Sequence, residues 1–503
     1  MRGIVPPAWG ADRCTGTIPA MDRAERARYY HEGSSAVGKH HPDRHLVVSL
    51  ALVAALAACT SSATPLAPRA SPAVSSAAPS AAARTAAGTP APASMSAAST
   101  PRTPPTGVDD TALLQAALNT CVPGGPTCMV RLPAGTYWTK QVVADNFHGS
   151  IVGAGEATTI LEALPGYVVG TVWSEPASAS NPWPYILTFG GTSDVRLSDL
   201  SFRVSAATPV PQGWHDPFAT SAGKPTGRPV TWLEGAVFVE GSARFARLFF
   251  EGAAGTTGGL DAMATAGSNL DTAVQVDEAH APAGVFVMSV CRTQGVGEGF
   301  EVSNFRGRAT IGGSPIAANT FADSSGGVYW NLSGATVSES YDRVQGGPAS
   351  GDTFADWFDE DRPATRPSVV MLTHNAVALA GPTASGVVVW YPTPMDTLLH
   401  LTITHNDISV RSRSAVALYA RNISDLVIAD NTVRGSGPAA IAVVSAGPTL
   451  QGNTLGGFAA ATASIILGLG TSGAHVTCTS PSDTLLDHGT GDTVTGCHLV
   501  GNL

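Results

Sequence analysis

The chain repeats one short phrase along its C-terminal part: an asparagine, one free residue and an aliphatic residue, each time directly after a short apolar stretch. The phrase begins at Asn375, Asn406, Asn431 and Asn453, with a fainter copy at Asn319. The steps between the last four are 31, 25 and 22 residues, so one supersecondary unit recurs with loops of varying length. This recurrence predicts a solenoid, in which each repeat stacks on its neighbours.

Asparagine suits the turn of such a coil for two reasons. It tolerates the left-handed backbone conformation that β-branched residues avoid, and its amide can both donate to and accept from an identical amide in the next coil. Residues 401–404, just before one phrase, alternate Leu, Thr, Ile, Thr, which is the pattern of a strand with one buried side. We therefore expect the asparagines to form a stacked column, although any single copy could be an ordinary turn residue.

The composition agrees with many short strands and turns and few long helices. Among 503 residues there are 55 glycines and 36 prolines, and charged residues make up only 13%. The net charge is −10, and no basic cluster lies beside interleaved aromatic residues. This argues against nucleic acid as a partner.

The N-terminal part predicts export. Residues 46–59 form an apolar run that is too short to span a bilayer but suits the core of a signal peptide. The run ends Leu-Ala-Ala-Cys at Cys59, which resembles the lipobox of bacterial lipoproteins, whose cysteine carries the lipid. The alternative is an ordinary secretory signal with a chance cysteine. Residues 1–59 are long for a signal region, so we expect the true start nearer the apolar run.

Residues 60–106 are almost wholly Ala, Ser, Pro and Thr and cannot form a core. We expect a disordered tether that holds the folded domain, residues 107–503, away from a membrane surface. A lipid anchor with such a tether needs no transmembrane helix. The predicted location is the cell envelope or cell surface.

The cysteine positions suggest two disulfides. Cys121 and Cys128 flank a Pro-Gly-Gly-Pro turn that can bring them together. Cys478 and Cys497 are 19 positions apart, close to one short coil, and neighbouring coils are separated by a distance that a disulfide accepts. Cys291 is then expected to be a buried thiol.

The domain opens with a predicted helix from residue 108 to residue 118, for which Asp109 or Asp110 is the N-cap and Leu114, Ala117 and Leu118 form the apolar side. This helix is expected to cover the first coil. Short strands follow, at Leu-Pro-Ala-Gly-Thr-Tyr in residues 132–137 and Ile-Val-Gly-Ala-Gly in residues 151–155.

These segments, taken in order with the asparagine repeats, resemble the pectate-lyase-like superfamily of right-handed parallel β-helix proteins. The resemblance runs from about residue 107 to the end and implies an all-β fold, a single-stranded right-handed parallel β-helix with an N-terminal capping helix. It implies a polysaccharide as partner and leaves lyase, hydrolase and non-catalytic proteins open. The motifs of polygalacturonase-like hydrolases are not intact: the only Asp-Asp pair is Asp109-Asp110, and the Trp-Ile-Asp-His segment of many pectate lyases is missing.

The densest group of acidic and aromatic residues lies in residues 352–362, within the 56-residue gap between Asn319 and Asn375. Carboxylates beside aromatic rings are typical of glycosidase sites, and an arginine can bind a uronate carboxylate. A solvated acidic loop is the alternative. The candidate catalytic residues are Asp356, Asp359 and Asp361, with Trp357 and Arg362 as candidates for substrate binding.

A second insertion, residues 206–231, is a candidate for the opposite wall of a groove. Lys224 or Arg228 would serve as a base for β-elimination, and Ca²⁺ is the cofactor expected if the protein is a uronate lyase. Trp214 and His215 complete the candidate substrate-binding residues there. A proline-rich surface loop is the alternative.

His374, His405 and Asp430 occupy the same position in successive phrases. Stacked, they could hold a metal, but solenoids stack like residues without any functional need, so no metal site is predicted. The functional hypothesis is an exported, lipid-anchored protein that acts on or binds polysaccharide; as an enzyme it would be a polysaccharide lyase or a glycoside hydrolase. The alternative is a non-catalytic glycan-binding or structural surface protein.

Overall fold

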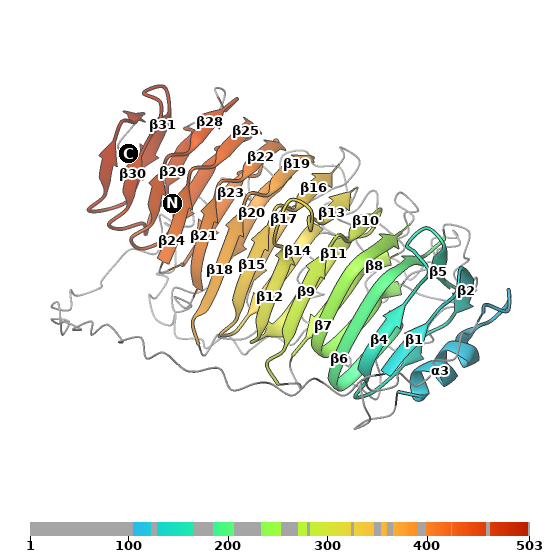
Figure 1. Ribbon diagram of the computed structural model, residues 1–503. Coiled ribbons are helices and arrows are strands. Elements are labelled where there is room, and N and C mark those ends of the chain that lie inside the picture. The colour runs from blue at the N-terminus through green and yellow to red at the C-terminus, as the bar shows by residue number, and fades with distance from the viewer. Residues whose placement is uncertain are drawn as a thin grey trace, which may run out of the picture.

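The chain forms an elongated stack of β-coils that begins at a short helix (Figure 1). The computed structural model describes the following residues, to which every structural statement below refers: 104–121, 128–164, 185–205, 233–252, 270–278, 282–322, 326–346, 354–359, 366–381, 383–390, 399–423, 425–458 and 463–500. Its 33 strands form one hydrogen-bonded sheet in which every described pairing is parallel. The prediction of a right-handed parallel β-helix is confirmed.

The helix α3 (Thr111–Asn119) covers the N-terminal end of the stack, as the sequence predicts. Leu114, Ala117 and Leu118 are its buried residues. The seven strands next to it are β1 (Cys128–Arg131), β2 (Gly135–Thr139), β3 (Val142–Val143), β4 (His148–Val152), β5 (Thr159–Ala163), β6 (Tyr185–Arg203) and β7 (Leu233–Glu251).

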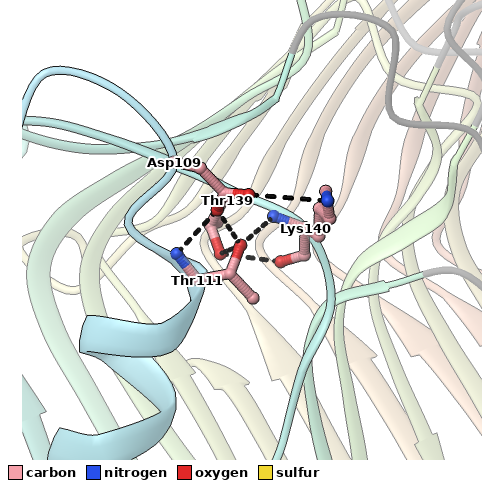
Figure 2. A network of polar contacts seen from close by, with 4 residues as sticks. All are labelled: Asp109, Thr111, Thr139 and Lys140. Carbon is pink, nitrogen blue, oxygen red and sulfur yellow. Dashed lines mark hydrogen bonds and ion pairs between the residues drawn. The ribbon is translucent and has the colours of Figure 1, made fainter.

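The two aspartates before α3 make different hydrogen bonds, whereas the sequence predicts that one of them caps the helix. Asp109 Oδ1 accepts a hydrogen bond from the backbone N of Thr111 at 3.0 Å, and its other oxygen lies 3.5 Å from Lys140 Nζ (Figure 2). The bonds from Thr111, helped by Lys140, lower the pKa of Asp109. Asp110 holds the N-cap position, but its buried carboxylate accepts from the backbone N of Thr106 and of Trp138 instead. Asp110 thus ties the entering chain to β2.

From β8 to β28, each coil places one strand on each of three sides of the solenoid, and the described strands after β28 belong to sides A and B. Each strand pairs with the strand at the same place in the next coil, so the strands of one side form a parallel ladder. Side A consists of β8 (Leu270–Asp277), β11 (Glu298–Phe305), β14 (Gly326–Leu332), β17 (Phe354–Asp359), β20 (Ser385–Trp390), β23 (Leu418–Arg421), β26 (Ile441–Val444), β29 (Ile465–Leu467), β31 (Thr484–Asp487) and β33 (His498–Leu499).

The other two sides follow the same rule. Side B consists of β9 (Val285–Ser289), β12 (Arg308–Gly312), β15 (Thr336–Ser340), β18 (Ser368–Thr373), β21 (Leu399–Thr404), β24 (Asp425–Ala429), β27 (Thr449–Gln451), β30 (His475–Thr477) and β32 (Thr493–Thr495). Side C consists of β10 (Arg292–Gln294), β13 (Thr320–Ala322), β16 (Arg343–Gly346), β19 (Ala376–Ala380), β22 (Asp407–Arg411), β25 (Thr432–Ser436) and β28 (Thr454–Gly456). The longer strands β6 and β7 bend around the corners; β7 pairs with β8, β9 and β10 in turn.

Aliphatic and aromatic residues from the three sides fill the interior and form one continuous core. In its middle, aromatic rings contact one another from coil to coil. Their centroids are 4.1 Å apart for Phe286 and Phe300, 6.1 Å for Phe300 and Trp330, and 6.1 Å for Trp330 and Phe358. Alternation along each strand is what places these residues inside.

The repeated asparagines form a hydrogen-bonded ladder at the corner between sides B and C. Asn375, Asn406 and Asn431 each donate their backbone N–H to the Oδ1 of the next asparagine, at 2.8, 3.0 and 3.1 Å. The last acceptor is Asn453, and all four side chains are buried. The expectation of a stacked column was therefore accurate for these rungs.

The left-handed backbone at this corner belongs to the residue before each asparagine, not to the asparagine itself. His374, His405 and Asp430 have φ values of 60°, 59° and 55°. Gly452 has a φ of 66°, and a Cβ at that position would collide with the Asp430 carboxylate. The asparagine therefore contributes a buried, hydrogen-bonded amide, and its backbone does not adopt the left-handed conformation.

Two disulfides are present, between Cys121 and Cys128 and between Cys478 and Cys497, with Cα–Cα distances of 5.4 and 5.1 Å. These are the pairs suggested by the sequence. Cys291 is a buried free thiol, and burial raises its pKa to about 12. Within the described residues, no helix has the length and apolar character to cross a membrane.

Candidate carbohydrate-binding face

Strand β17 separates the acidic and aromatic residues of the group that the sequence analysis found in residues 352–362. Because side chains alternate along a strand, Asp356 and Phe358 point into the solenoid and Trp357 points outward. Asp356 is only 2% exposed, and Oδ1 accepts a hydrogen bond from Trp330 Nε1 at 2.9 Å. A buried carboxylate at this place cannot contact a polysaccharide on the outer surface, so the assignment of Asp356 as a catalytic residue is wrong.

The remaining residues of the predicted groove are mostly outside the described part of the chain. Asp359 is the last residue of β17. Those outside the described residues are Asp361, Arg362, Trp214, His215, Lys224 and Arg228, together with Cys59 and almost all of the tether.

Trp357 belongs to a row of positions at the outward side of the alternation, which crosses β7 and six successive strands of side A, from β8 to β23. In register, these positions are Phe238, Gln275, Glu301, Tyr329, Trp357, Val388 and Tyr419, which we call the outer row. Glu301, Tyr329, Trp357 and Tyr419 are half-buried, whereas Phe238, Gln275 and Val388 are buried. The residues on either side of each position are buried; around Tyr329, for example, they are Val328 and Trp330. The row is therefore a consequence of strict strand alternation in every coil.

Aromatic rings are concentrated along this row. Tyr329 and Trp357 are direct neighbours in adjacent coils and are half-buried. The ring of Phe354 contacts Trp357 edge-on, with centroids 5.6 Å apart. Nearer the N-terminal end, the rings of Tyr185 and Phe238 are 5.3 Å apart, but both are buried and add no surface to this face. In the coil that contains Tyr329, the outward positions of β15 and β16 are polar or charged: Thr336, Ser338, Arg343 and Gln345.

A hydrogen-bonded polar group interrupts the aromatic residues. Gln275 Nε2 and Ser303 Oγ both donate to Glu301 Oε1, at 2.7 and 2.8 Å. Tyr185 donates its hydroxyl hydrogen bond to Gln275. Two bonds to one oxygen fix the orientation of the Glu301 carboxylate, which is half-buried beside Tyr329 of the next coil.

The far end of the row carries a positive charge. Arg421, two residues after Tyr419 on β23, lies on the same side of the strand. Burial raises the pKa of Tyr419, and the nearby Arg421 offsets part of this effect. The half-buried part of the row thus runs from the Glu301 carboxylate past Tyr329 and Trp357 to Tyr419, with the Arg421 guanidinium beside it.

Two residues of this face, Glu301 and Tyr329, have a local pattern in the sequence that predicts their outward position. Glu301 lies between Phe300 and Val302, and Tyr329 lies between Val328 and Trp330, so each is an outward residue within an apolar stretch. Placing the two side by side requires the register between coils, and loops of unequal length hide that register. The long-range pairing could be read only from the structure.

Aromatic rings next to the asparagine ladder also stack from coil to coil at the corner between sides B and C. The ring centroids of Tyr341 and His374 are 4.9 Å apart, and those of His374 and His405 are 5.1 Å apart. No group of three or more His, Cys, Asp or Glu side chains within the described ranges is arranged to hold a metal ion.

These features define a parallel β-helix protein with an aromatic and acidic face on one side. No protein-family model and no curated protein matches the chain. Among solved structures, it is similar to the A-module of mannuronan C-5 epimerase AlgE4 from Azotobacter vinelandii, with 13% identity, a TM-score of 0.37 and coverage of 78% of this chain and 96% of the other. It is also similar to DFA-IIIase from Arthrobacter chlorophenolicus A6, with 12% identity, a TM-score of 0.33 and coverage of 80% and 82%.

A third similar structure is PfbA, a surface adhesin of Streptococcus pneumoniae, with 12% identity, a TM-score of 0.30 and coverage of 71% of this chain and 89% of the other. At these values the likeness extends to the class of fold alone.

Proposed function

We propose that the protein binds or acts on a polysaccharide along the outer row of side A. The observation that carries this proposal is the alignment of Glu301, Tyr329 and Trp357 at one outward position in three consecutive coils. Aromatic rings offer large, rigid apolar surfaces for the C–H faces of sugars, and oriented polar groups between them can bind hydroxyl groups. A solenoid extends this arrangement along its axis, which suits a polymeric ligand.

Glu301 is the carboxylate on this face best placed to serve as an acid or base. Its orientation is fixed by Gln275 and Ser303, and Tyr329 lies beside it. Asp277, on the preceding strand of side A, is a second carboxylate, whose Oδ1 accepts from Asn304 Nδ2 at 3.1 Å. Hydrolase or lyase chemistry would use Glu301 with Asp277, or with Asp359, Asp361, Lys224 or Arg228, and a uronate lyase would add Ca²⁺.

We further propose that the protein is exported and held at the cell envelope through a lipid on Cys59, with residues 60–106 as a tether. Palmitate labelling of cells that produce the full chain tests the anchor. Label on the wild-type protein and none on a Cys59→Ser variant is the expected result; equal label on both would refute it.

Binding is tested by affinity electrophoresis against a panel of neutral and acidic polysaccharides. We expect Trp357→Ala and Tyr329→Ala each to weaken binding about tenfold, since an aromatic contact contributes on the order of 1 kcal/mol beyond its buried area. Met371→Ala is the control, because Met371 is an exposed hydrophobic residue on side B. If all three variants bind like the wild type, the outer row is not the binding face.

Catalysis is tested separately by measuring new reducing ends and unsaturated uronate products, with and without Ca²⁺. We expect Glu301→Gln to abolish product formation while binding persists. Binding without any product from the wild-type protein would favour the non-catalytic alternative.

A further inference from the structure

The interior of the solenoid contains a pair of carboxyl groups, Glu339 on β15 and Asp356 on β17. Glu339 is 1% exposed and points inward between Ile311 and Leu372, its partners in the adjacent coils. Asp356 points inward from side A, in register with Val328 and Val387. Both acids thus occupy positions where neighbouring coils place aliphatic side chains.

The two buried carboxyl groups interact with each other through their charges and through a side-chain hydrogen bond, but as carboxylates they would present only acceptors. Trp330 Nε1 donates to Asp356 Oδ1 at 2.9 Å. In the described part of the chain, no donor of the protein reaches Oε1 or Oε2 of Glu339. When one of the two groups is protonated, it can donate a hydrogen bond to the other. This avoids the high free-energy cost of two unpaired buried charges.

The charged surroundings do not compensate for a second negative charge. The ionisable side chains acting on Glu339 are Asp356 and Asp342, and those acting on Asp342 include Asp356. The side chains that pack from β12, β14, β18 and β20 are neutral: Ile311, Val328, Trp330, Leu372 and Val387. No Lys, Arg or His within the described ranges pairs with either acid of the pair.

Burial is the main reason why all three acids hold their protons more strongly than usual. Burial, reinforced by the charges of Asp356 and Asp342, raises the pKa of Glu339 well above its ordinary value. Burial raises the pKa of Asp356 to about 6, partly offset by the hydrogen bonds from Glu339 and Trp330. Burial also raises the pKa of Asp342 to about 7, although hydrogen bonds from Asn319 oppose the shift.

We propose that Glu339 and Asp356 share one proton inside the solenoid, and that its loss makes the coil from β14 to β19 an element that is stable in acid and loosens above neutral pH. This proposal is independent of the proposed polysaccharide-binding function. Deprotonation releases a proton to the solvent and leaves two adjacent carboxylates in an apolar interior. The two carboxylates then repel each other and favour the entry of water.

The sign of the pH dependence follows from proton linkage. In the unfolded chain these carboxyl groups titrate near pH 4, so between about pH 4 and about pH 7 the folded protein binds more protons than the unfolded one. The stabilisation is fully present below about pH 4 and is lost as the pH rises through the folded-state pKa values of the pair: about 6 for Asp356 and well above the ordinary value for Glu339.

Thermal unfolding of the full chain at about pH 5 and about pH 8 tests this sign, because the folded-state pKa of Asp356, about 6, lies between the two pH values. We expect the wild-type midpoint to fall by several degrees between the two, and Glu339→Gln to remove at least half of that fall. Asp430→Asn is the matched control, since Asp430 is an exposed aspartate, and its fall should equal that of the wild type. Equal falls for the wild type and Glu339→Gln would overturn the proposal.

Two measurements need no variant. Infrared spectra of the wild-type protein at about pH 6, where exposed carboxyl groups are ionised, should retain the C=O band of a protonated carboxyl group. Absence of that band would refute a shared proton. A chelator should leave the midpoint unchanged, and a lower midpoint after chelation would mean that a bound cation, not a proton, separates the two acids.

Local opening is tested by amide hydrogen exchange at the same two pH values, corrected for the intrinsic pH dependence of exchange. We expect protection in β15, β17 and β18 to decrease at the higher pH while protection in β24 and β25 is unchanged. A uniform change over all five strands would contradict a local element.

Discussion

Asp342 accepts two hydrogen bonds from Asn319 through a single oxygen, Oδ1, at 2.7 Å from the backbone N and 3.0 Å from Nδ2. Its own backbone N donates to Asn375 Oδ1 at 2.9 Å. Asp342 therefore occupies the rung between Asn319 and Asn375, and the ladder runs through the interval that the sequence showed as a gap. An aspartate here has one acceptor too many, because Oδ2 is buried without a hydrogen-bond partner in the described part of the chain.

Replacing Asp342 with asparagine should stabilise the protein at about pH 8, by roughly 1–3 kcal/mol, the cost of one unsatisfied buried polar group. The new Nδ2 can donate as Asn406 Nδ2 does to the carbonyl oxygen of Leu372, at 3.0 Å. Since the pKa of Asp342 is about 7, the wild-type side chain is protonated at about pH 5 and can donate there itself. Urea unfolding should therefore show a smaller gain at about pH 5; an equal gain at both pH values would contradict this account.

Removing a rung from the middle of the ladder should be much more damaging. Asn431 Oδ1 accepts from both the backbone N and Nδ2 of Asn406, and its Nδ2 donates to Ile403 O and Asn453 Oδ1. Asn431→Ala leaves at least two buried donors without acceptors, so we expect a loss of roughly 2–5 kcal/mol. The control is His405→Asn, which keeps a residue that tolerates positive φ and removes only an exposed ring. Denaturant unfolding should show a loss of less than about 1 kcal/mol for the control; similar losses for both variants would mean that ring stacking, not the amide ladder, stabilises this corner.

The fold could be predicted because the ladder residues are local signals. The apolar alternation and the turn that follows each strand lie within about ten residues of Asn406 or Asn431, and repetition makes a chance reading improbable. The rung at Asp342 could not be predicted, because a carboxylate does not match the asparagine phrase, and the interval between Asn319 and Asn375 therefore read as a gap in the repeat. The two disulfides could be suggested because the coil spacing itself sets the distance between the cysteines.

The candidate face could not be predicted in the same way. Whether Asp356 points inward or outward depends on where β17 begins, and a shift of one residue exchanges the two sides of a strand. The neighbours of Trp357 are Tyr329 and Val388, which lie 28 and 31 positions away along the chain. Such distances vary with each loop, so only the structure brings Glu301, Tyr329 and Trp357 into one row.

Glycine at position 435 should be essential for close packing of β22 and β25. Gly435 has a φ of 140°, and a Cβ there would overlap the backbone carbonyl of Val410. We expect Gly435→Ala to destabilise the protein by roughly 3 kcal/mol or more, because backbone strain and a backbone clash combine. Gly456→Ala, on the next strand of side C, is the control, since only Arg434 Cγ lies within reach, at 3.9 Å. Thermal unfolding that shows equal effects for both variants would contradict the steric argument.

The disulfide between Cys478 and Cys497 should protect the last coils and nothing else. Cys478 directly follows β30 and Cys497 directly precedes β33, so the bond joins neighbouring coils at the C-terminal end. Each coil of a solenoid contacts only its neighbours, and the terminal coil has a partner on one side only. We expect Cys497→Ser to increase amide hydrogen exchange strongly in β30 to β33 and to leave β15 to β22 unchanged, whereas Thr495→Ser, a nearby conservative change, should leave both regions as they are. Faster exchange throughout the solenoid in Cys497→Ser would show that the bond stabilises the whole fold and would contradict its local role.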